Sequence, residues 1–137
     1  MDAGEFDIRV LTACGIEDHH AHLLRLDYLD RCLFFSTGCD DRAVDAHCLR
    51  LIASQAIVVG AYDQGRLRAS VEIIPDRAAR CGTATLIAEP DFQSDELAET
   101  LMRRAQAEAA SHGLARVDFV GMTGSPQMLR HQIARFA

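Results

Sequence analysis

The sequence predicts an α/β fold of the α+β kind, in which helices cover both faces of a mixed central sheet. Apolar residues recur with the period of a strand in some stretches and with the period of a helix in others. These stretches follow the order β-α-α-β-β-β-α-β-α along the chain. At 137 residues the chain has the length of one domain with a sizeable core, so we expect a single domain over residues 1–137.

The first half of the chain is expected to contain one strand and two helices. In residues 5–13, apolar and polar residues alternate, which is typical of a strand. Residues 17–30 begin with acidic residues and continue with leucines, as in a helix whose charges match its dipole. In residues 40–54, apolar residues recur at i, i+4, i+7 and i+8, which predicts a second amphipathic helix.

The second half is expected to contain four strands and two helices. Residues 56–63 and 67–74 are predicted to form a hairpin whose turn contains Gly65. A strand over residues 82–89 ends at Pro90. The elements that follow are a helix from Asp95 to His112 capped by Gly113, a strand over residues 115–122, and a final helix that starts at Ser125.

The composition excludes some classes of function. The chain carries 14 basic and 20 acidic residues, and its net charge of −6 argues against a nucleic-acid-binding surface. No apolar run approaches the ~20 residues that span a bilayer, and the N-terminus does not have the pattern of a signal peptide. We therefore expect a cytoplasmic protein that binds neither nucleic acid nor a membrane.

Cysteine and histidine residues are expected to play no chemical role. The five cysteines contain no C-x-x-C pair, and we expect them to be reduced and mostly buried. His19, His20 and His22 lie close together, and His19 and His22 have the i, i+3 spacing of two ligands on one helix. Because no fixed further ligand is visible, we predict a solvated helix start here and no metal site.

Four stretches of the sequence, in this order and spacing, resemble the GNAT N-acyltransferase superfamily. They are HLLRLDYLDRCLFF (22–35), VVGAYDQGRLRASVEI (58–73), PDFQSDELAETLMRRAQAEAASHGLARV (90–117) and SPQMLRHQIARF (125–136). In that family, such stretches form the first helix (in one bacterial branch), the central hairpin, the acyl-CoA segment and the last helix. The resemblance covers residues 7–137. It implies a GNAT-like fold and the transfer of an acyl group from acyl-CoA to an amine.

The resemblance also implies where acetyl-CoA or another acyl-CoA would bind. In this family, backbone N–H groups at a helix start hold the pyrophosphate, and the main chain of the preceding strand pairs with the pantetheine. The family motif [Q/R]-x-x-G-x-[G/A] falls on Gln93, Ser94, Asp95, Glu96, Leu97 and Ala98. The pantetheine strand falls on Leu86, Ile87 and Ala88, and Ser125 occupies a position that is commonly Asn in the last helix.

Two acidic residues in this motif depart from the family pattern. Glu96 stands at the glycine position, and Asp95 stands at a position that is commonly basic or glycine. Carboxylates in a first helical turn stabilise the helix by ~0.3–1 kcal/mol each. They would repel a pyrophosphate at ~4 Å by about 1 kcal/mol per charge pair in water, and by ~4 kcal/mol at an effective dielectric constant of about 20. This helix start is therefore either self-capped without a ligand, or an anion site whose acidic side chains turn outward.

The resemblance implies a general base that deprotonates the amine, often a Glu on a central strand. Glu72 is the favoured candidate by position, and Glu89 is the second. The usual Tyr acid of the family falls on Gln132. We therefore predict an acyl-CoA-dependent N-acyltransferase that transfers an acetyl group to a small-molecule or protein amine by direct attack on the thioester. The alternative is a catalytically degenerate GNAT-fold module that binds or regulates without turnover.

Family members usually continue past the last helix into two further strands that flank the substrate. We expect these C-terminal strands to be absent here, which would leave the strand over residues 115–122 at an uncovered sheet edge. An uncovered edge favours pairing with another chain. We therefore expect a homodimer that closes this edge.

Overall fold

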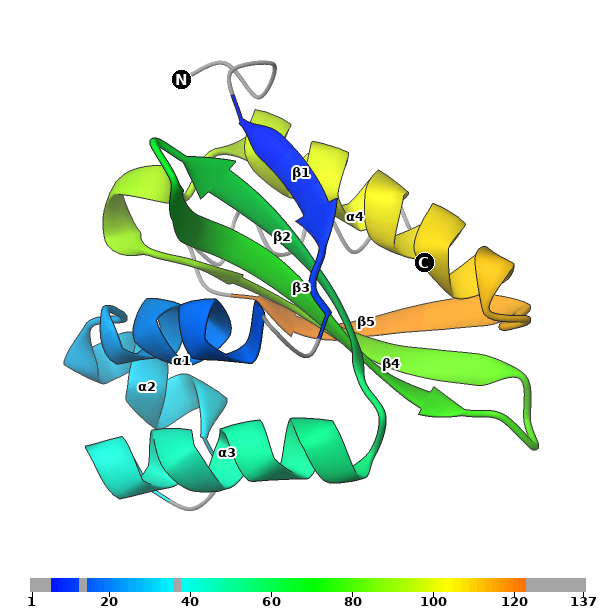
Figure 1. The fold of residues 1–137 in the computed structure, drawn as a ribbon, viewed down its shortest axis with the longest axis horizontal. Coiled ribbons are helices and arrows are strands. Elements are labelled where there is room, and N and C mark those ends of the chain that lie inside the picture. The colour runs from blue at the N-terminus through cyan, green and yellow to red at the C-terminus, as the bar shows by residue number, and fades with distance from the viewer. Residues whose placement is uncertain (1–5, 13–14, 36–37, 123–137) are drawn as a thin grey trace.

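The structure, a computed structural model, describes residues 6–12, 15–35 and 38–122 (Figure 1). At its centre is a five-stranded sheet with the spatial order β1-β2-β3-β4-β5. Neighbouring strands from β1 to β4 are antiparallel, whereas β4 and β5 are parallel. The strands are β1 (Asp7–Val10), β2 (Ile57–Asp63), β3 (Arg66–Asp76), β4 (Cys81–Ala88) and β5 (Arg116–Met122). The mixed sheet predicted from the sequence is therefore confirmed.

Helices lie on both faces of this sheet, as predicted (Figure 1). One face carries α4 (Asp95–Ser111), and the other carries α1 (Ile16–Leu24), α2 (Tyr28–Phe34) and α3 (Asp41–Ala53). A short 3-10 turn, η3 (Pro90–Phe92), connects β4 to α4. Within the part of the chain that the structure describes, no helix is long and apolar enough to cross a membrane. The predicted final helix, which includes Ser125, lies outside the described residues.

The hairpin of β2 and β3 has the tight turn that its sequence predicts. Gln64 and Gly65 connect the strands, with φ angles of 51° and 79°. A two-residue loop with positive φ at both positions matches the twist of the flanking strands. The pairing continues to Ile57 opposite Ile73. This register decides which side chains of β3 face each layer of helices.

α4 builds a core on its face of the sheet because its apolar residues recur with the period of a helix. Its buried residues are Leu97, Ala98, Leu101, Met102, Ala105 and Ala109. Ser94 caps the start by accepting a hydrogen bond from the Leu97 N–H at 3.2 Å. Past its end, Gly113 has a φ of +82°, a backbone conformation that favours glycine. The predicted helix is confirmed to within one residue at its C-terminus.

The single helix predicted over residues 17–30 is wrong, because the segment forms two helices. α1 ends at Leu24, and Asp27 adopts an extended conformation with a ψ of 168°. The Asp27 side chain accepts a hydrogen bond from the Asp30 N–H at 2.9 Å, so it caps a new helix, α2. The cap therefore ends the single predicted helix and starts α2 at Tyr28.

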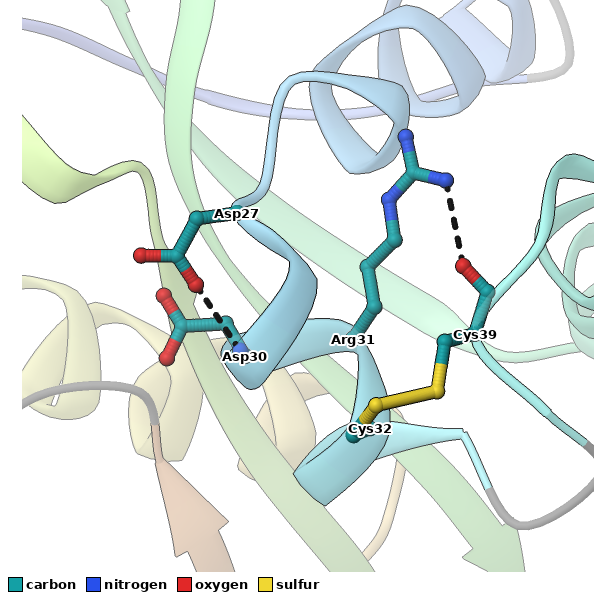
Figure 2. Close-up of a disulfide and its surroundings, with 5 residues drawn as sticks. All are labelled: Asp27, Asp30, Arg31, Cys32 and Cys39. Atoms are coloured by element: carbon teal, nitrogen blue, oxygen red, sulfur yellow. Dashed lines mark hydrogen bonds between the residues drawn. A yellow bond between two sulfur atoms is a disulfide. The ribbon is translucent and has the colours of Figure 1, made fainter.

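The cysteines also differ from the prediction, because Cys32 and Cys39 form a disulfide (Figure 2). Their Cα atoms are 5.0 Å apart, within the usual range for such a bond. The bond joins α2 to the segment that precedes α3, and a hydrogen bond from Arg31 Nη1 to the Cys39 carbonyl crosses the same gap at 3.3 Å. Cys48 and Cys81 are free thiols, and Cys48 is buried as expected. Disulfides are rare in reducing compartments, so the cytoplasmic location stays a prediction.

Candidate active site

Successive side chains of β3 point to opposite faces of the sheet, and this alternation creates the candidate site. Val71 and Ile73 belong to the apolar cluster under α4. Ser70 and Glu72 therefore face α1 and α3, where both side chains are buried. Glu72 pairs with Thr85 of β4, the residue before Leu86, so it lies one strand away from the predicted pantetheine strand.

Two histidines donate hydrogen bonds to the buried Glu72 carboxylate. His19 of α1 bonds through its Nε2 to Oε2 at 2.6 Å. His47 of α3 bonds through its Nε2 to Oε1 at 2.7 Å and to Oε2 at 2.9 Å. A carboxylate can only accept, so we assign the proton to Nε2 in both rings. Glu72 thereby holds the two imidazoles, which come from different helices, in fixed orientations.

These hydrogen bonds decide the protonation state of Glu72. Burial alone would raise the pKa of this carboxyl, but the bonds from His19 and His47 outweigh burial and lower the pKa to about 2. A carboxylate with so low a pKa accepts a proton weakly near neutral pH, where a general base works best with a pKa close to the ambient value. Glu72 is therefore better suited to orienting the two imidazoles than to accepting a proton.

His47 lines a cleft between α2, α3 and β3 with a volume of about 540 Å³. Phe34, Arg50 and Ile74 also line it. The His47 side chain is 14% exposed, and its ring packs edge-on against Phe35 with ring centroids 5.0 Å apart. An aromatic wall, a guanidinium and an oriented imidazole therefore meet in a space large enough for a small molecule or a side chain.

Glu89, the second predicted base, binds three basic side chains. It accepts from His22 Nδ1 at 2.9 Å, from Arg25 Nε at 3.0 Å and from Arg68 Nη1 at 2.9 Å. Burial would raise the pKa of Glu89, but these partners lower it below its ordinary value. Both oxygens are occupied, so Glu89 connects α1 to β3 at the start of the turn that leads into α4.

His22 is also fully buried. Burial lowers its pKa to about 4, although the hydrogen bond to Glu89 acts in the opposite direction. The neutral ring donates from Nδ1 to Glu89, so its Nε2 accepts the Ser70 hydroxyl at 3.2 Å. All polar atoms of His22 therefore have partners inside the protein.

The predicted solvated start of α1 is therefore wrong for two of its three histidines. His19 and His22 are 0% exposed, whereas the His20 side chain is 37% exposed. Burial is tolerated because carboxylates from β3 and from the end of β4 supply the hydrogen bonds. Among the described residues, no three His, Cys, Asp or Glu side chains are placed to hold a metal ion.

The predicted pyrophosphate segment forms the turn into α4. Gln93 donates to the Ala88 carbonyl at 3.1 Å and to Asp30 of α2 at 3.3 Å. Asp95 and Glu96 are exposed, and Asp95 begins the helix. The side chains of Leu97 and Ala98 are buried in the core, so only their main chain faces the turn.

The predicted pantetheine strand is the last part of β4. β4 pairs with β5 from Cys81 opposite Arg116 to Leu86 opposite Met122, and Ile87 and Ala88 lie beyond this pairing in the described residues. The three predicted side chains are buried, Ile87 toward α1–α3 and the other two toward α4. This strand would therefore meet a ligand through main-chain groups. Ser125 lies outside the described residues.

The structure brings Glu72 to the strand next to Leu86, but it separates Glu72 from Glu89 along β3 and β4. The hydrogen-bonding roles of His19, His22, Arg25, His47 and Arg68 were not predicted from the sequence. The i, i+3 spacing of His19 and His22 was a usable signal, because it places both rings on one side of a helix. Their partners lie 53 and 67 residues away, which no local pattern reveals.

Comparison with protein-family models and with curated protein sequences finds no match. Solved structures do match. The GNAT domain of S. lividans PAT has a TM-score of 0.73 at 13% identity, over 94% of this chain and 79% of that chain. A ribosomal-protein-alanine N-acetyltransferase from Brucella melitensis biovar Abortus 2308 has a TM-score of 0.64 at 16% identity, over 96% and 91%. An aminoglycoside N-acetyltransferase in complex with CoA has a TM-score of 0.58 at 15% identity, over 95% and 84%.

The chain therefore has the GNAT fold, and the resemblance seen in its sequence is confirmed at that level. Identities this low establish the fold alone. Because one fold supports many functions, the activity must be argued from the side chains of the site.

Proposed function

We propose that the protein is an acyl-CoA-dependent N-acyltransferase that acetylates an amine by direct attack on the thioester. The observation that carries this proposal is the Glu72–His47 pair, which places an oriented imidazole in a cleft between α2, α3 and β3. Acetyl-CoA would lie along the main chain of Leu86, Ile87 and Ala88. Solved structures of the same fold, one of them in complex with CoA, support this cofactor.

His47 is the proposed proton acceptor, and Glu72 positions it. The amine nitrogen attacks the acyl carbon while an imidazole nitrogen of His47 accepts the proton that the nitrogen loses. The carbon–sulfur bond then breaks, the CoA thiolate leaves and takes a proton from solvent, and His47 returns the amine proton to solvent. The products are an amide and free CoA. Because the His47 Nε2–H donates to Glu72, the ring nitrogen that accepts is Nδ1.

The acceptor is proposed to be a primary amine on a small molecule or on a protein. The printed names of the matching structures include both kinds, an aminoglycoside and a ribosomal-protein alanine. The Phe34 ring beside His47 gives the cleft an apolar wall for the body of the acceptor.

A homodimer is proposed on the ground that β5 is the last strand of the described sheet. Sedimentation showing a monomer at high micromolar concentration would contradict it.

Turnover is tested by incubating the protein with acetyl-CoA and a panel of amines, and by detecting acetylated products by mass spectrometry. The panel contains a polyamine, an aminoglycoside and a peptide with a free N-terminal alanine. We expect one class to be acetylated, with equal release of free CoA thiol. The proposal fails if no class is acetylated by a protein that binds acetyl-CoA.

The start of α4 favours a second candidate, a GNAT-fold binding or regulatory module without turnover. Asp95 and Glu96 are exposed in the first turn, and Ser94 already caps the Leu97 N–H. A ligand that binds only the folded state adds RT ln(1 + [L]/Kd) to the free energy of unfolding and so raises the melting temperature. An increase with acetyl-CoA supports the enzyme. No increase at millimolar acetyl-CoA, in the wild type and in an Asp95→Asn/Glu96→Gln variant alike, supports the module.

A further inference from the structure

A second cleft lies across α3 from the His47 cleft, between the end of β1, α1 and the start of β2. Its volume is about 390 Å³, within the range of small-molecule sites. Six apolar side chains line it, among them Leu11, Ile16 and Ile52, together with Thr12, Gln55 and His19. Among the described residues that line it, none is acidic and none is Arg or Lys. The cleft is therefore an apolar space with few polar groups.

His19 provides one of these polar groups, and half of its hydrogen-bonding capacity is unused. Its Nε2–H donates to the Glu72 carboxylate at 2.6 Å, and in this tautomer Nδ1 is an acceptor. The residue is 0% exposed, and Nδ1 has no hydrogen-bond partner within residues 6–12, 15–35 and 38–122. Buried polar side-chain atoms are satisfied in the large majority of cases. A carboxylate on the opposite nitrogen also makes Nδ1 a stronger acceptor.

We propose that this second cleft is a binding site for an apolar molecule that carries one uncharged hydrogen-bond donor, which bonds to His19 Nδ1. The apolar walls fit the body of the ligand, and the unpaired acceptor fits an N–H or O–H group. A ligand that presents only acceptors would place one of its lone pairs against the lone pair of His19 Nδ1, and the two would repel each other. An ammonium group would lose its hydration in a cleft whose described lining residues include no carboxylate, and this loss costs more than the group gains.

Indole and 1-methylindole test this proposal as a matched pair of probes. Indole has an N–H donor and no strong acceptor, and 1-methylindole has nearly the same body without the donor. We expect both to bind, and we expect indole to bind about tenfold more tightly, because its N–H satisfies a buried acceptor. The readout is the imidazole ¹⁵N resonance of His19 in protein labelled at histidine, assigned by its loss in His19→Phe. The Nδ1 resonance is expected to shift with indole only.

Two tryptophan substitutions on α3 locate the site. Ile52 is 55% exposed and lines the cleft, so Ile52→Trp is expected to block both indoles. Leu49 is 67% exposed on the same helix but does not line the cleft, so Leu49→Trp is the control that should leave binding unchanged. His19→Phe keeps a ring in place without Nδ1 and should remove the preference for indole. If His19→Phe does not fold, the tryptophan pair and the relative affinities of the two indoles for the wild type still decide the question.

Equal affinity for the two indoles overturns the proposal, as does the absence of saturable binding at millimolar probe. An unshifted His19 Nδ1 resonance, or unchanged binding in Ile52→Trp, overturns it as well. None of these measurements uses acetyl-CoA or an acceptor amine. The proposal for the second cleft is therefore tested independently of the proposed transferase activity.

Discussion

The two faces of the sheet are built from the same strands but by different means (Figure 1). Under α4, the alternate residues Val71 and Ile73 of β3 join an apolar cluster. On the opposite face, Ser70 and Glu72 of the same strand join hydrogen-bonded pairs with histidines from α1 and α3. One residue of register thus separates a hydrophobic core from a polar network.

The difference shows that the α4 face contributes mainly to the stability of the fold, whereas the opposite face contains the groups proposed to take part in the reaction. Apolar packing on the α4 face depends on shape and tolerates few changes in volume. The polar face depends on complete hydrogen bonding, because a buried charge without partners is costly. The Glu89 carboxylate accepts hydrogen bonds from the guanidinium groups of Arg25 and Arg68, and these bonds connect α1 to β3. Glu72 accepts its hydrogen bonds from the imidazoles of His19 and His47, and His47 also lines a cleft.

The largest effect on the reaction is expected from a substitution of His47, on the polar face of the sheet. His47→Gln keeps a polar side chain in the cleft but removes the proton acceptor, so the rate of acetyl transfer should fall by about 10²–10⁴-fold. Product formation by mass spectrometry measures this, with the exposed His112→Gln as the matched control. A His47→Gln enzyme with the wild-type rate and pH profile would show that the proton goes elsewhere.

Removing Glu89 should destabilise the fold more than it changes the chemistry. Glu89→Ala leaves two guanidinium groups and His22 without their acceptor. Loss of one partner of a buried ion pair costs about 3–5 kcal/mol, and we expect about 2–4 kcal/mol because both arginines reach solvent. Urea denaturation measures the loss, and Asp91→Ala, at an exposed acid in the same turn, is the control. A loss below about 1 kcal/mol would refute the structural role.

A cavity on the apolar face should change stability without changing the reaction. Leu101 is 0% exposed, and Leu101→Ala should lower the free energy of unfolding by about 2–5 kcal/mol. The acetylation rate per folded molecule should stay at the wild-type value. The exposed Arg104→Ala on the same helix serves as control. A selective loss of rate in Leu101→Ala would mean that the two faces are coupled.

Acid should weaken the polar face in two steps. The pKa of His22 is lowered to about 4 in the folded protein by burial, so the unfolded chain binds a proton first and stability falls between pH ~6.5 and ~4. The pKa of Glu72 is lowered to about 2 by its hydrogen bonds, which outweigh burial, so further stability is lost as pH falls from ~4.5 to ~2. Each step amounts to roughly 3 kcal/mol. Urea midpoints measured from pH 7 to pH 3 test this, and flat midpoints above pH 4.5 would contradict the His22 step.

The features predicted correctly from sequence are those set by local pattern. The period of Leu97, Leu101 and Ala105 predicts α4, and Gly65 predicts the hairpin turn. The paired strands then place Glu72 on a central strand, as the sequence analysis expected. These features need no knowledge of distant residues.

The predictions that were wrong concern features that depend on contacts between distant segments. Burial of His19 is favourable only because Glu72, 53 residues later in the sequence, accepts its hydrogen bond. The Cys32–Cys39 bond requires the close approach of two Cα atoms across the α2–α3 connection, which spacing alone does not reveal. Asp27 can continue a helix or cap a new one, and packing of α2 against its neighbours decides between the two.

A crystal structure of the protein with CoA is the decisive test of the proposed reaction. We expect the pantetheine to follow the main chain of Leu86, Ile87 and Ala88, and its sulfur to point toward the cleft that contains His47. Clear density for CoA at another surface, or a sulfur directed toward the α4 core, would contradict the proposed reaction and leave only the fold.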